Sequence, residues 1–276
     1  MNALYRATGI SKQAVYQYAH RQQTFDDRVR DLMIEAQELR RAHPGCGVEK
    51  MYYTLAPDFI GRDRFIETFM ALGYRLKTKR NYQVTTRSSK LYFPNLIEGL
   101  RLDGPSQVWQ SDITYIRVKE RFYYAVFIID VYSRKIVGYS LSDHMRATAN
   151  VKALKMALKH HPPPKYHHSD RGSQYLYKEY TKLLKECHTQ ISMGKIAQEN
   201  AYAERINGTI KNEYLDYWKP ESYAQLQAQV KKAVGNYNQR RIHNNLKRKT
   251  PQEISENAWR ASSPLLQMDI FKYENV

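Results

Sequence analysis

Apolar residues recur with helical spacing in the early part of the chain. In residues 25–42 they fall at three- and four-residue steps, which is typical of an amphipathic helix with one buried face: Val29, Leu32, Met33, Ala36 and Leu39. A His-Pro-Gly sequence ends this helix, and two shorter helical patterns follow at 48–56 and 62–72, with Gly73 as the stop. The pattern predicts a small helical bundle over residues 25–74.

After Pro94 the pattern becomes that of strands. Residues 108–118 alternate between apolar and polar positions, residues 122–131 form a nearly continuous apolar run typical of a central strand, and residues 133–141 resemble a third strand. Helices and short strands then alternate: a helix at 147–159, a strand ending at His168, a helix at 177–187, a strand at 189–193 and a helix at 199–215. This order predicts an α/β domain over residues 105–220, a ribonuclease-H-like five-stranded mixed sheet with flanking helices.

Further segments flank these regions. Residues 1–24 contain Gly9 followed by Ser11, which can cap a helix, and this piece is similar to the second half of a helix-turn-helix. We therefore expect a partial helix-turn-helix at 1–24; the alternative is a capped short helix that makes no DNA contact. Residues 221–276 are expected to form a basic C-terminal helical segment. The bundle at 25–74 is interpreted as a DNA-binding region, with a helical spacer as the alternative.

The charge of the chain favours a polyanionic partner. Its 44 Lys and Arg residues against 27 Asp and Glu residues give a formal net charge of +17, more than solubility requires. Residues 75–104 are expected to be a basic linker, because no acidic residue interrupts its cations before Lys90. A second basic stretch lies at 231–249, and the alternative interpretation of both is a merely basic surface. The candidates for DNA contact in these stretches are Lys77, Lys79, Arg80 and Arg241.

Other features argue against several classes of protein. The two cysteines, Cys46 and Cys187, lack the spacing of a zinc finger or of a disulfide framework. The sequence contains no run of about 18 apolar residues and no secretory signal pattern. We therefore expect a cytoplasmic protein that has no membrane partner.

Three acidic residues occupy positions that metal chemistry would use. Asp112 lies between apolar neighbours in the first strand, where an acid is costly unless a cation compensates it. Asp170 follows the fourth strand, where Gly172 lets the backbone turn sharply, and Glu204 lies on the next helix. Each acid taken singly is more often structural or solvated. Because phosphodiester chemistry needs several carboxylates around two divalent cations, we predict that Asp112, Asp170 and Glu204 are catalytic and hold two Mg²⁺ or Mn²⁺ ions.

The helix that carries Glu204 offers further candidates. Residues 204, 207, 208 and 211 share one helix face, so Asn207 and Lys211 are expected to face DNA beside Glu204, with little bulk at Gly208. Glu199 is the competing third carboxylate. It lies about 140° around the helix from Glu204, so only one of the two can face the metal ions.

These motifs resemble the DDE catalytic core of the IS three family of bacterial insertion sequences, whose cores are similar to retroviral integrase. The resemblance is carried by Trp109-x-x-Asp112-Ile113-Thr114-Tyr115, His168-Ser169-Asp170-Arg171-Gly172-Ser173-Gln174-Tyr175, and Asn200-Ala201-x-x-Glu204-Arg205 followed by Lys211. It continues into Tyr237-Asn238-x-x-Arg241-x-His243 and, upstream, into an integrase-associated helix-turn-helix. The segment between Asp170 and Glu204 is shorter than in the family, but the Asn-Ala pair and Lys211 keep the motif register. This register favours Glu204 over Glu199.

The resemblance implies a transposase that cleaves the ends of an insertion sequence and joins the released 3′-hydroxyl to another phosphodiester. Its partners would be double-stranded DNA, both element ends and target, and further copies of the chain in a homodimer or higher oligomer. An upstream-frame protein or fusion is a further implied partner, and the implied location is the nucleoid of a bacterial cytoplasm. Asn207 and Lys211 would position the terminal DNA. The alternatives are a ribonuclease-H-like DNA nuclease without strand transfer and a DNA-end-binding regulatory subunit.

Overall fold

The computed structural model describes residues 11–76, 92–260 and 264–270. The chain divides into two compact units, Met1–Leu76 and Lys77–Val276, and each has hydrophobic clusters of its own. Within the described residues, no helix has both the length and the apolar character needed to cross a membrane.

The first unit is helical. Its helices are α2 (Lys12–Ala42), α3 (Val48–Leu55) and α4 (Arg62–Ala71). The apolar face of α2 beyond residue 25 joins α3 and α4 around Phe65 and Phe69, whose stacked rings have centroids 4.1 Å apart. The amphipathic pattern of the sequence therefore predicted the buried face of this bundle.

Helix α2 begins earlier than the sequence pattern indicates. The sequence predicts a short capped helix within residues 1–24 and a second helix from residue 25, but one helix runs from Lys12 to Ala42. Ser11 caps it as predicted, because its hydroxyl accepts a 3.0 Å hydrogen bond from the Ala14 amide. No Gly or Pro interrupts residues 12–42, so nothing separates the expected partial helix-turn-helix from the bundle.

The second unit is built on a five-stranded mixed sheet, as predicted. Its strands are β2 (Val108–Val118), β3 (Arg121–Asp130), β4 (Ile136–Ser142), β5 (Tyr166–Ser169) and β6 (Gln190–Met193), in the order β4-β3-β2-β5-β6. β2, β3 and β4 form an antiparallel meander, whereas β5 runs parallel to β2 and β6 parallel to β5. The central position of β2 gives its side chains access to elements on both sides.

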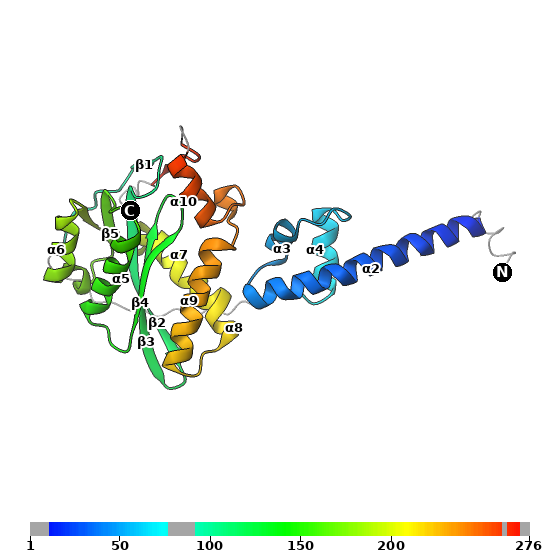
Figure 1. Ribbon diagram of the computed structural model, residues 1–276, viewed down its shortest axis with the longest axis horizontal. Coiled ribbons are helices and arrows are strands. Elements are labelled where there is room, and N and C mark those ends of the chain that lie inside the picture. The colour runs from blue at the N-terminus through cyan, green and yellow to red at the C-terminus, as the bar shows by residue number, and fades with distance from the viewer. Residues whose placement is uncertain (1–10, 77–91, 261–263, 271–276) are drawn as a thin grey trace. The chain divides into compact units, whose positions relative to one another are not determined.

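Helices cover both faces of this sheet (Figure 1). α5 (Ala147–His160) and α6 (Lys178–Glu186) pack on one face, and α7 (Ala201–Thr209) and α9 (Tyr223–Gln239) pack on the other. The alternation along β3 separates the two clusters, since Ala125, Phe127 and Ile129 lie with α7 and α9 while Val126 and Ile128 lie with α5. The α7 and α9 face is the one on which the candidate site forms.

Segments outside residues 105–220 also contribute to the second unit. β1 (Arg101–Leu102) pairs antiparallel with β7 (Met268–Asp269), and residues of α10 (Pro251–Arg260) join a cluster with Val108 and Tyr132. The structure thus differs from the predicted boundaries at residues 104 and 220. Apolar positions of α9 are buried on the sheet rather than in a separate C-terminal segment: Leu226, Val230, Ala233 and Tyr237.

Candidate active site

The sheet register makes Asp112 and Asp170 neighbours. β2 and β5 are parallel, and Ser111 pairs with Ser169. The next residue along each of these strands is one of the two predicted acids. Their carboxylates interact, because Asp170 is among the charges that raise the pKa of Asp112.

Gly172 completes a tight turn around Asp170. Its amide donates a 3.1 Å hydrogen bond to Oδ1 of Asp170. A Cβ at this position would lie 2.9 Å from the same oxygen, so the absence of a side chain lets the backbone approach the carboxylate, as the sequence predicts.

Glu204 lies in the first turn of α7 and belongs to the same electrostatic group. Although solvent reaches its side chain, partial burial and then Asp170 raise its pKa. Glu204 in turn raises the pKa of Asp112. Three carboxylates from three different elements therefore influence one another.

The pKa of Asp112 is strongly shifted. Burial, followed by the charge of Asp170, raises its pKa to about 8. The shift is opposed by the Ile113 amide, which donates to Oδ1 at 2.9 Å, and by Asn207, whose Nδ2 donates to Oδ2 at 2.7 Å. Such a buried acid beside other acids is costly unless a cation neutralises it.

The donor chemistry of this group fits a hard divalent cation. Carboxylate oxygens are the ligands that Mg²⁺ and Mn²⁺ prefer, and all three side chains supply them. Among the described residues, no three His, Cys, Asp or Glu side chains are already arranged as a closed metal site. The carboxylates are therefore close enough to interact but are not drawn together around a common centre.

Glu199, the competing third carboxylate, is turned toward the chain segment that precedes it. Its side chain accepts a hydrogen bond from the Lys195 amide. A Cβ at Gly194 would lie 2.9 Å from the Cβ of Glu199, so the two backbones are close. Glu199 is not among the causes that raise the pKa of Glu204. The geometry associates Glu204, rather than Glu199, with the aspartates.

Gln110, a buried residue of β2, fixes the start of α7. Its Nε2 donates to the carbonyl of Glu199 at 3.1 Å, and its Oε1 accepts from the amides of Tyr202 and Ala203 at 3.2 and 3.4 Å. The first amides of a helix lack partners within the helix, so Gln110 satisfies two of them. Sequence reasoning passed over this residue, although a polar side chain in a buried strand signals a specific partner.

Asn200 makes a second connection between α7 and β2. It is buried, and its Nδ2 donates a 3.0 Å hydrogen bond to the carbonyl of Ser111. Ser111 immediately precedes Asp112, so this bond holds the helix that carries Glu204 against the strand that carries Asp112. The sequence identified Asn200 only as part of a motif, and its structural contribution is this bridge.

Asn207 and Lys211 both approach β2, on the face where the helical spacing predicts them. Asn207 is buried and bonded to Asp112, so its amide faces a carboxylate. Lys211 lies in the π-helical segment η3 (Ile210–Leu215), with its Nζ 5.3 Å from the ring centroid of Tyr115. Burial lowers the pKa of Lys211, while Asp216 and then Asp112 raise it. DNA contact by Asn207 and Lys211 stays a prediction.

Arg241 occupies a buried ion pair in this structure. Its guanidinium binds both carboxylate oxygens of Glu213, at 2.8 and 2.7 Å, and its side chain is 11% exposed. Its Nη1 also lies 3.0 Å from Nε2 of His243. The DNA contact expected of Arg241 remains a prediction, because its donors face protein groups.

The other basic candidates, Lys77, Lys79 and Arg80, lie outside the described residues.

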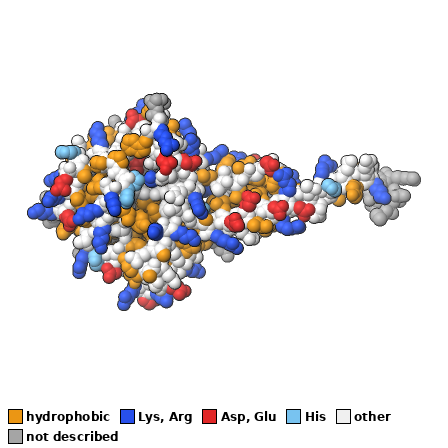
Figure 2. All heavy atoms as spheres, viewed as in Figure 1, with side chains coloured by type: hydrophobic (Ala, Val, Ile, Leu, Met, Phe, Trp, Pro, Cys, Tyr) orange, Lys and Arg blue, Asp and Glu red, His pale blue; other side chains and the backbone are white. Residues whose placement is uncertain are grey.

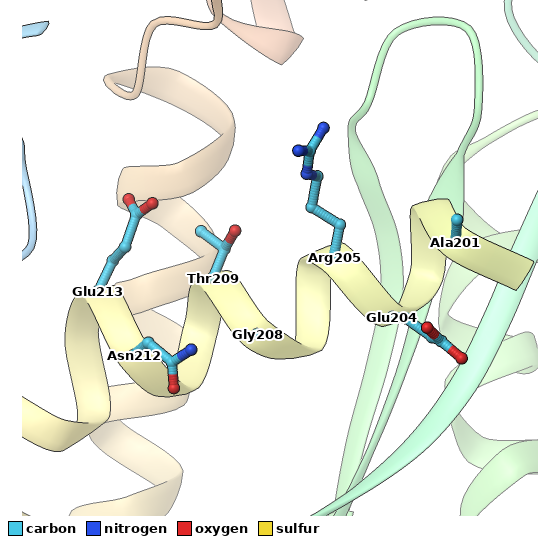
Figure 3. Close-up of a pocket in the computed structure, with 7 residues that line it drawn as sticks. All are labelled: Ala201, Glu204, Arg205, Gly208, Thr209, Asn212 and Glu213. Atoms are coloured by element: carbon cyan, nitrogen blue, oxygen red, sulfur yellow. The ribbon is translucent and has the colours of Figure 1, made fainter. Parts of the chain in front are cut away.

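A pocket follows the exposed side of α7 and η3, from Ala201 to Glu213 (Figure 3). Glu204 points to the strand side of the helix, whereas Arg205 and Glu213 point to the other side. Gly208 also lines the pocket and, having no side chain, adds little bulk to the helix surface there, as the sequence predicts. Glu204 is therefore accessible to a large ligand along the helix.

Two histidines next to Asp170 serve the packing of β5. Nε2 of His167 lies 2.9 Å from the Tyr180 hydroxyl, and Nδ1 of His168 lies 2.8 Å from the Ser192 hydroxyl. Burial lowers the pKa of His167 to about 3 and that of His168 to about 4. Both are therefore neutral and buried near neutral pH.

Comparison with known proteins gives a consistent result. Residues 103–198 match the family described as integrase core domain, and residues 185–251 match a second family with the same description. A subunit in the structure of the simian T-cell lymphotropic virus intasome, in complex with the PP2A regulatory subunit B56 gamma, superposes with a TM-score of 0.55 at 16% identity. That match covers 83% of this chain and 73% of the other, and it confirms the predicted fold class.

Curated relatives extend the similarity over most of the chain. A 31 kDa protein of insertion element IS600 from Shigella sonnei is 30% identical over 90% of this chain and 96% of its own length. The transposase for insertion sequence element IS904 from Lactococcus lactis subsp. lactis (strain IL1403) is 32% identical over 71% of this chain and 79% of its own length. These matches confirm the resemblance to insertion-sequence proteins that the motifs indicate. The chain thus belongs to the insertion-sequence transposases that carry an integrase core domain, and it is a polynucleotidyl transferase.

Proposed function

We propose that this transposase cleaves the DNA ends of an insertion sequence and joins the released 3′-hydroxyl to another phosphodiester, with Asp112, Asp170 and Glu204 as catalytic residues. The observation that carries the proposal is the mutual influence of these three carboxylates, which come from β2, the end of β5 and the first turn of α7. Acids with a purely structural role would not need to lie so close that each carboxylate affects the pKa of another.

The same carboxylates would hold two divalent cations, Mg²⁺ or Mn²⁺. When bound, such ions supply Lewis-acid stabilisation of the attacking and leaving oxygens in a phosphodiester displacement. The chain provides the oxygen ligands and their orientation. Asn207 holds one oxygen of Asp112, and Gly172 holds one oxygen of Asp170, so neither carboxylate rotates freely when a ligand arrives.

DNA is the proposed substrate, both as the element end and as the target. A net charge of +17 supports a polyanionic ligand, and Lys and Arg side chains are spread over the face of the second unit seen in Figure 2. Lys211 and Asn207 are proposed to position the terminal DNA beside Glu204. Because two ends must be brought together, the active species is proposed to be a homodimer or a higher oligomer, with an upstream-frame protein or fusion as a further partner.

Substitution of Asp112 by Asn tests the catalytic assignment. The side chain keeps its size and loses its charge, so DNA binding is expected to persist while cleavage and joining of a labelled end fall to background. Glu204→Gln should behave in the same way. Cleavage that continues at the parental rate in both variants would contradict the assignment.

A second assay separates a transposase from a nuclease. A precleaved oligonucleotide with a free 3′-hydroxyl bypasses the first step and should be joined to an unlabelled target in the presence of Mg²⁺ or Mn²⁺. A 3′-deoxy end should not be joined, because it lacks the attacking oxygen. Cleavage without any joining would favour the nuclease alternative, and binding without either reaction would favour the regulatory one.

A further inference from the structure

The β2–β3 hairpin extends beyond the rest of the sheet. The last pair between β3 and β4 is Tyr124 with Ser142, and the last pair between β2 and β5 is Ser111 with Ser169. Past these positions β2 and β3 continue alone to Val118 and Arg121. In Figure 1 the closed end of this hairpin lies at the bottom of the sheet, below α5 and α6.

The two faces of the extension differ. On one face Ile116 and Val118 are buried, and Tyr123 stacks on Tyr223 at 4.9 Å between ring centroids. The opposite face carries four side chains that we call the hairpin platform: Tyr115, Arg117, Phe122 and Tyr124. The cluster beneath α5 reaches Ile113 on β2 and Val126 on β3 but includes none of the four.

The platform presents the Phe122 ring to solvent, whereas Tyr115 and Tyr124 are half-buried. The side chain of Phe122 is 47% exposed, and its ring meets Tyr115 edge to face, with centroids 5.6 Å apart. Phe122 is thus an exposed aromatic side chain on a strand extension, and exposed apolar groups of this kind can mark a binding surface. Aromatic faces of this kind stack on nucleic-acid bases.

Positive charge surrounds these rings. The hairpin carries Arg117, Lys119 and Arg121 against a single acid, Glu120. The Arg117 guanidinium lies 3.1 Å from Glu120, but both side chains are largely exposed, so this pair is weak and can be exchanged for a phosphate. The charge of the surface is therefore complementary to DNA rather than to a second copy of a basic chain.

Lys211 connects the platform with the candidate active site. Its Nζ lies 5.3 Å from the centroid of the Tyr115 ring, and its charge interacts with Asp112. Tyr115 and Asp112 are three residues apart on β2, so their side chains lie on opposite faces of the hairpin. β2 pairs with β5 only as far as Ser111, and Lys211 approaches both residues beyond that point. A DNA strand that passes Glu204 and Lys211 therefore reaches the platform by crossing this free edge of β2.

We propose that the hairpin platform binds an unpaired segment of the DNA strand that leaves the active site, with a base stacked on Phe122 and Tyr115 and the adjoining phosphates beside Arg117 and Lys119. This inference rests on the proposed function for the identity of the DNA. Stacking requires an exposed base face, so the platform selects single-stranded or frayed DNA over fully paired duplex.

Binding of two matched DNA probes tests the proposal in the full chain. Both are measured in an Asp112→Asn background, so that neither probe is consumed: one is a duplex with a short single-stranded extension, and the other is a fully paired duplex of the same length. Phe122→Ala should weaken binding of the extended probe about tenfold, the range expected for one lost base stack, and leave the paired duplex unchanged. Phe122→Trp should retain binding, whereas Phe122→Leu, which keeps apolar bulk without an aromatic face, should not.

Trp259→Ala is the matched control, because Trp259 is an exposed aromatic on α10. It should leave binding of both probes unchanged. An equal loss for both probes in Phe122→Ala, or no loss for either, would overturn the proposal. So would dispersal of an oligomer by Phe122→Ala, measured by sedimentation, with unchanged affinity for the extended probe. Because this assay needs no cleavage, an inactive wild-type protein would count against the proposed function and not against the platform.

Discussion

Nδ2 of Asn207 donates a 2.7 Å hydrogen bond to Oδ2 of Asp112. The other oxygen of Asp112 accepts from the Ile113 amide at 2.9 Å. Each oxygen therefore has one protein donor and keeps lone pairs for a further ligand. A helix residue thus sets the rotation of the strand carboxylate that we propose as a metal ligand, and Asn207 becomes a positioning residue for Asp112.

Substitution of Asn207 by Ala should weaken metal use more than folding. Without the amide, the Asp112 carboxylate loses its orientation, and outer partners of metal ligands contribute about 10- to 100-fold to metal affinity or activity. We expect the Mg²⁺ concentration for half-maximal cleavage to rise by about that factor. Asn244→Ala, at an exposed position of the C-terminal region, is the control, and an equal effect in both variants would argue against a positioning role.

The third carboxylate can be identified by a paired substitution. Glu204→Gln should abolish cleavage, because Glu204 is the acid that interacts with Asp112 and Asp170. Glu199→Gln should retain cleavage within a fewfold of the parent, since the Glu199 side chain holds the Lys195 amide instead. End-cleavage rates at saturating Mg²⁺ measure both. The reverse pattern would make Glu199 the ligand.

The sequence predicted the sheet because its patterns are local. The alternation in 108–118 and the apolar run after it each mark a strand, and both strands form close to the predicted positions. The alternation does not report burial in β2, where the polar side chains of Gln110, Ser111 and Thr114 are buried as well. The two aspartates could be paired for the same reason, since Asp112 lies within β2 and Asp170 directly follows β5. The register of β2 with β5 then makes them neighbours.

Other features depend on contacts between distant segments and were not predictable in this way. The hydrogen bonds from Gln110 to the start of α7 join residues far apart in the chain, so no local sequence spacing predicts them. The burial of Arg241 was missed because its sequence neighbours are basic, whereas its partner Glu213 lies on another element. Helix α2 continues through residue 24 because no helix breaker interrupts it. The residues before 25 are mostly polar and lack the apolar periodicity from which a helix is predicted.

Arg241 gives a prediction that separates structural from DNA-binding roles. Removal of one partner from a largely buried ion pair costs on the order of 3 kcal/mol, because the other charge stays buried without compensation. Arg241→Ala and Glu213→Gln should therefore both lower the free energy of unfolding by that order in chemical denaturation. If only Arg241→Ala weakened DNA binding and neither changed stability, the sequence-based assignment of DNA contact would be preferred.

Gly138 on β4 sets how closely α5 packs on the sheet. A Cβ at this position would lie 2.4 Å from the carbonyl oxygen of Ala153 and 2.8 Å from the Cβ of Ala157. Gly138→Ala should therefore force α5 away from β4 and destabilise the unit by about 1–3 kcal/mol, seen as a lower midpoint of denaturation. Gly235→Ala in α9, where nothing lies within 4 Å, should be neutral or stabilising by about 0.5–1 kcal/mol. Similar losses in both variants would contradict the packing argument.

His167 makes the stability of the second unit depend on pH. Burial, and then the neighbouring His168, lower its pKa from 6.5 to about 3. The unfolded chain therefore binds a proton at a higher pH than the folded one, so this contribution to stability is complete above about pH 6.5. It is lost as the pH falls from there toward 3, at up to about 1.4 kcal/mol per pH unit.

His167→Gln should remove this dependence, because Gln does not titrate. Unfolding free energies measured between neutral pH and about pH 5 should fall less steeply in the variant than in the parent, whatever the change in stability at neutral pH. His168 and His161, whose pKa values are also lowered by burial, would leave part of the slope in place. Gln190→Asn, a substitution without a titrating group at an exposed position of β6, should keep the full parental slope. If the two variants had the same slope, the buried His167 would not be the group that charges on unfolding.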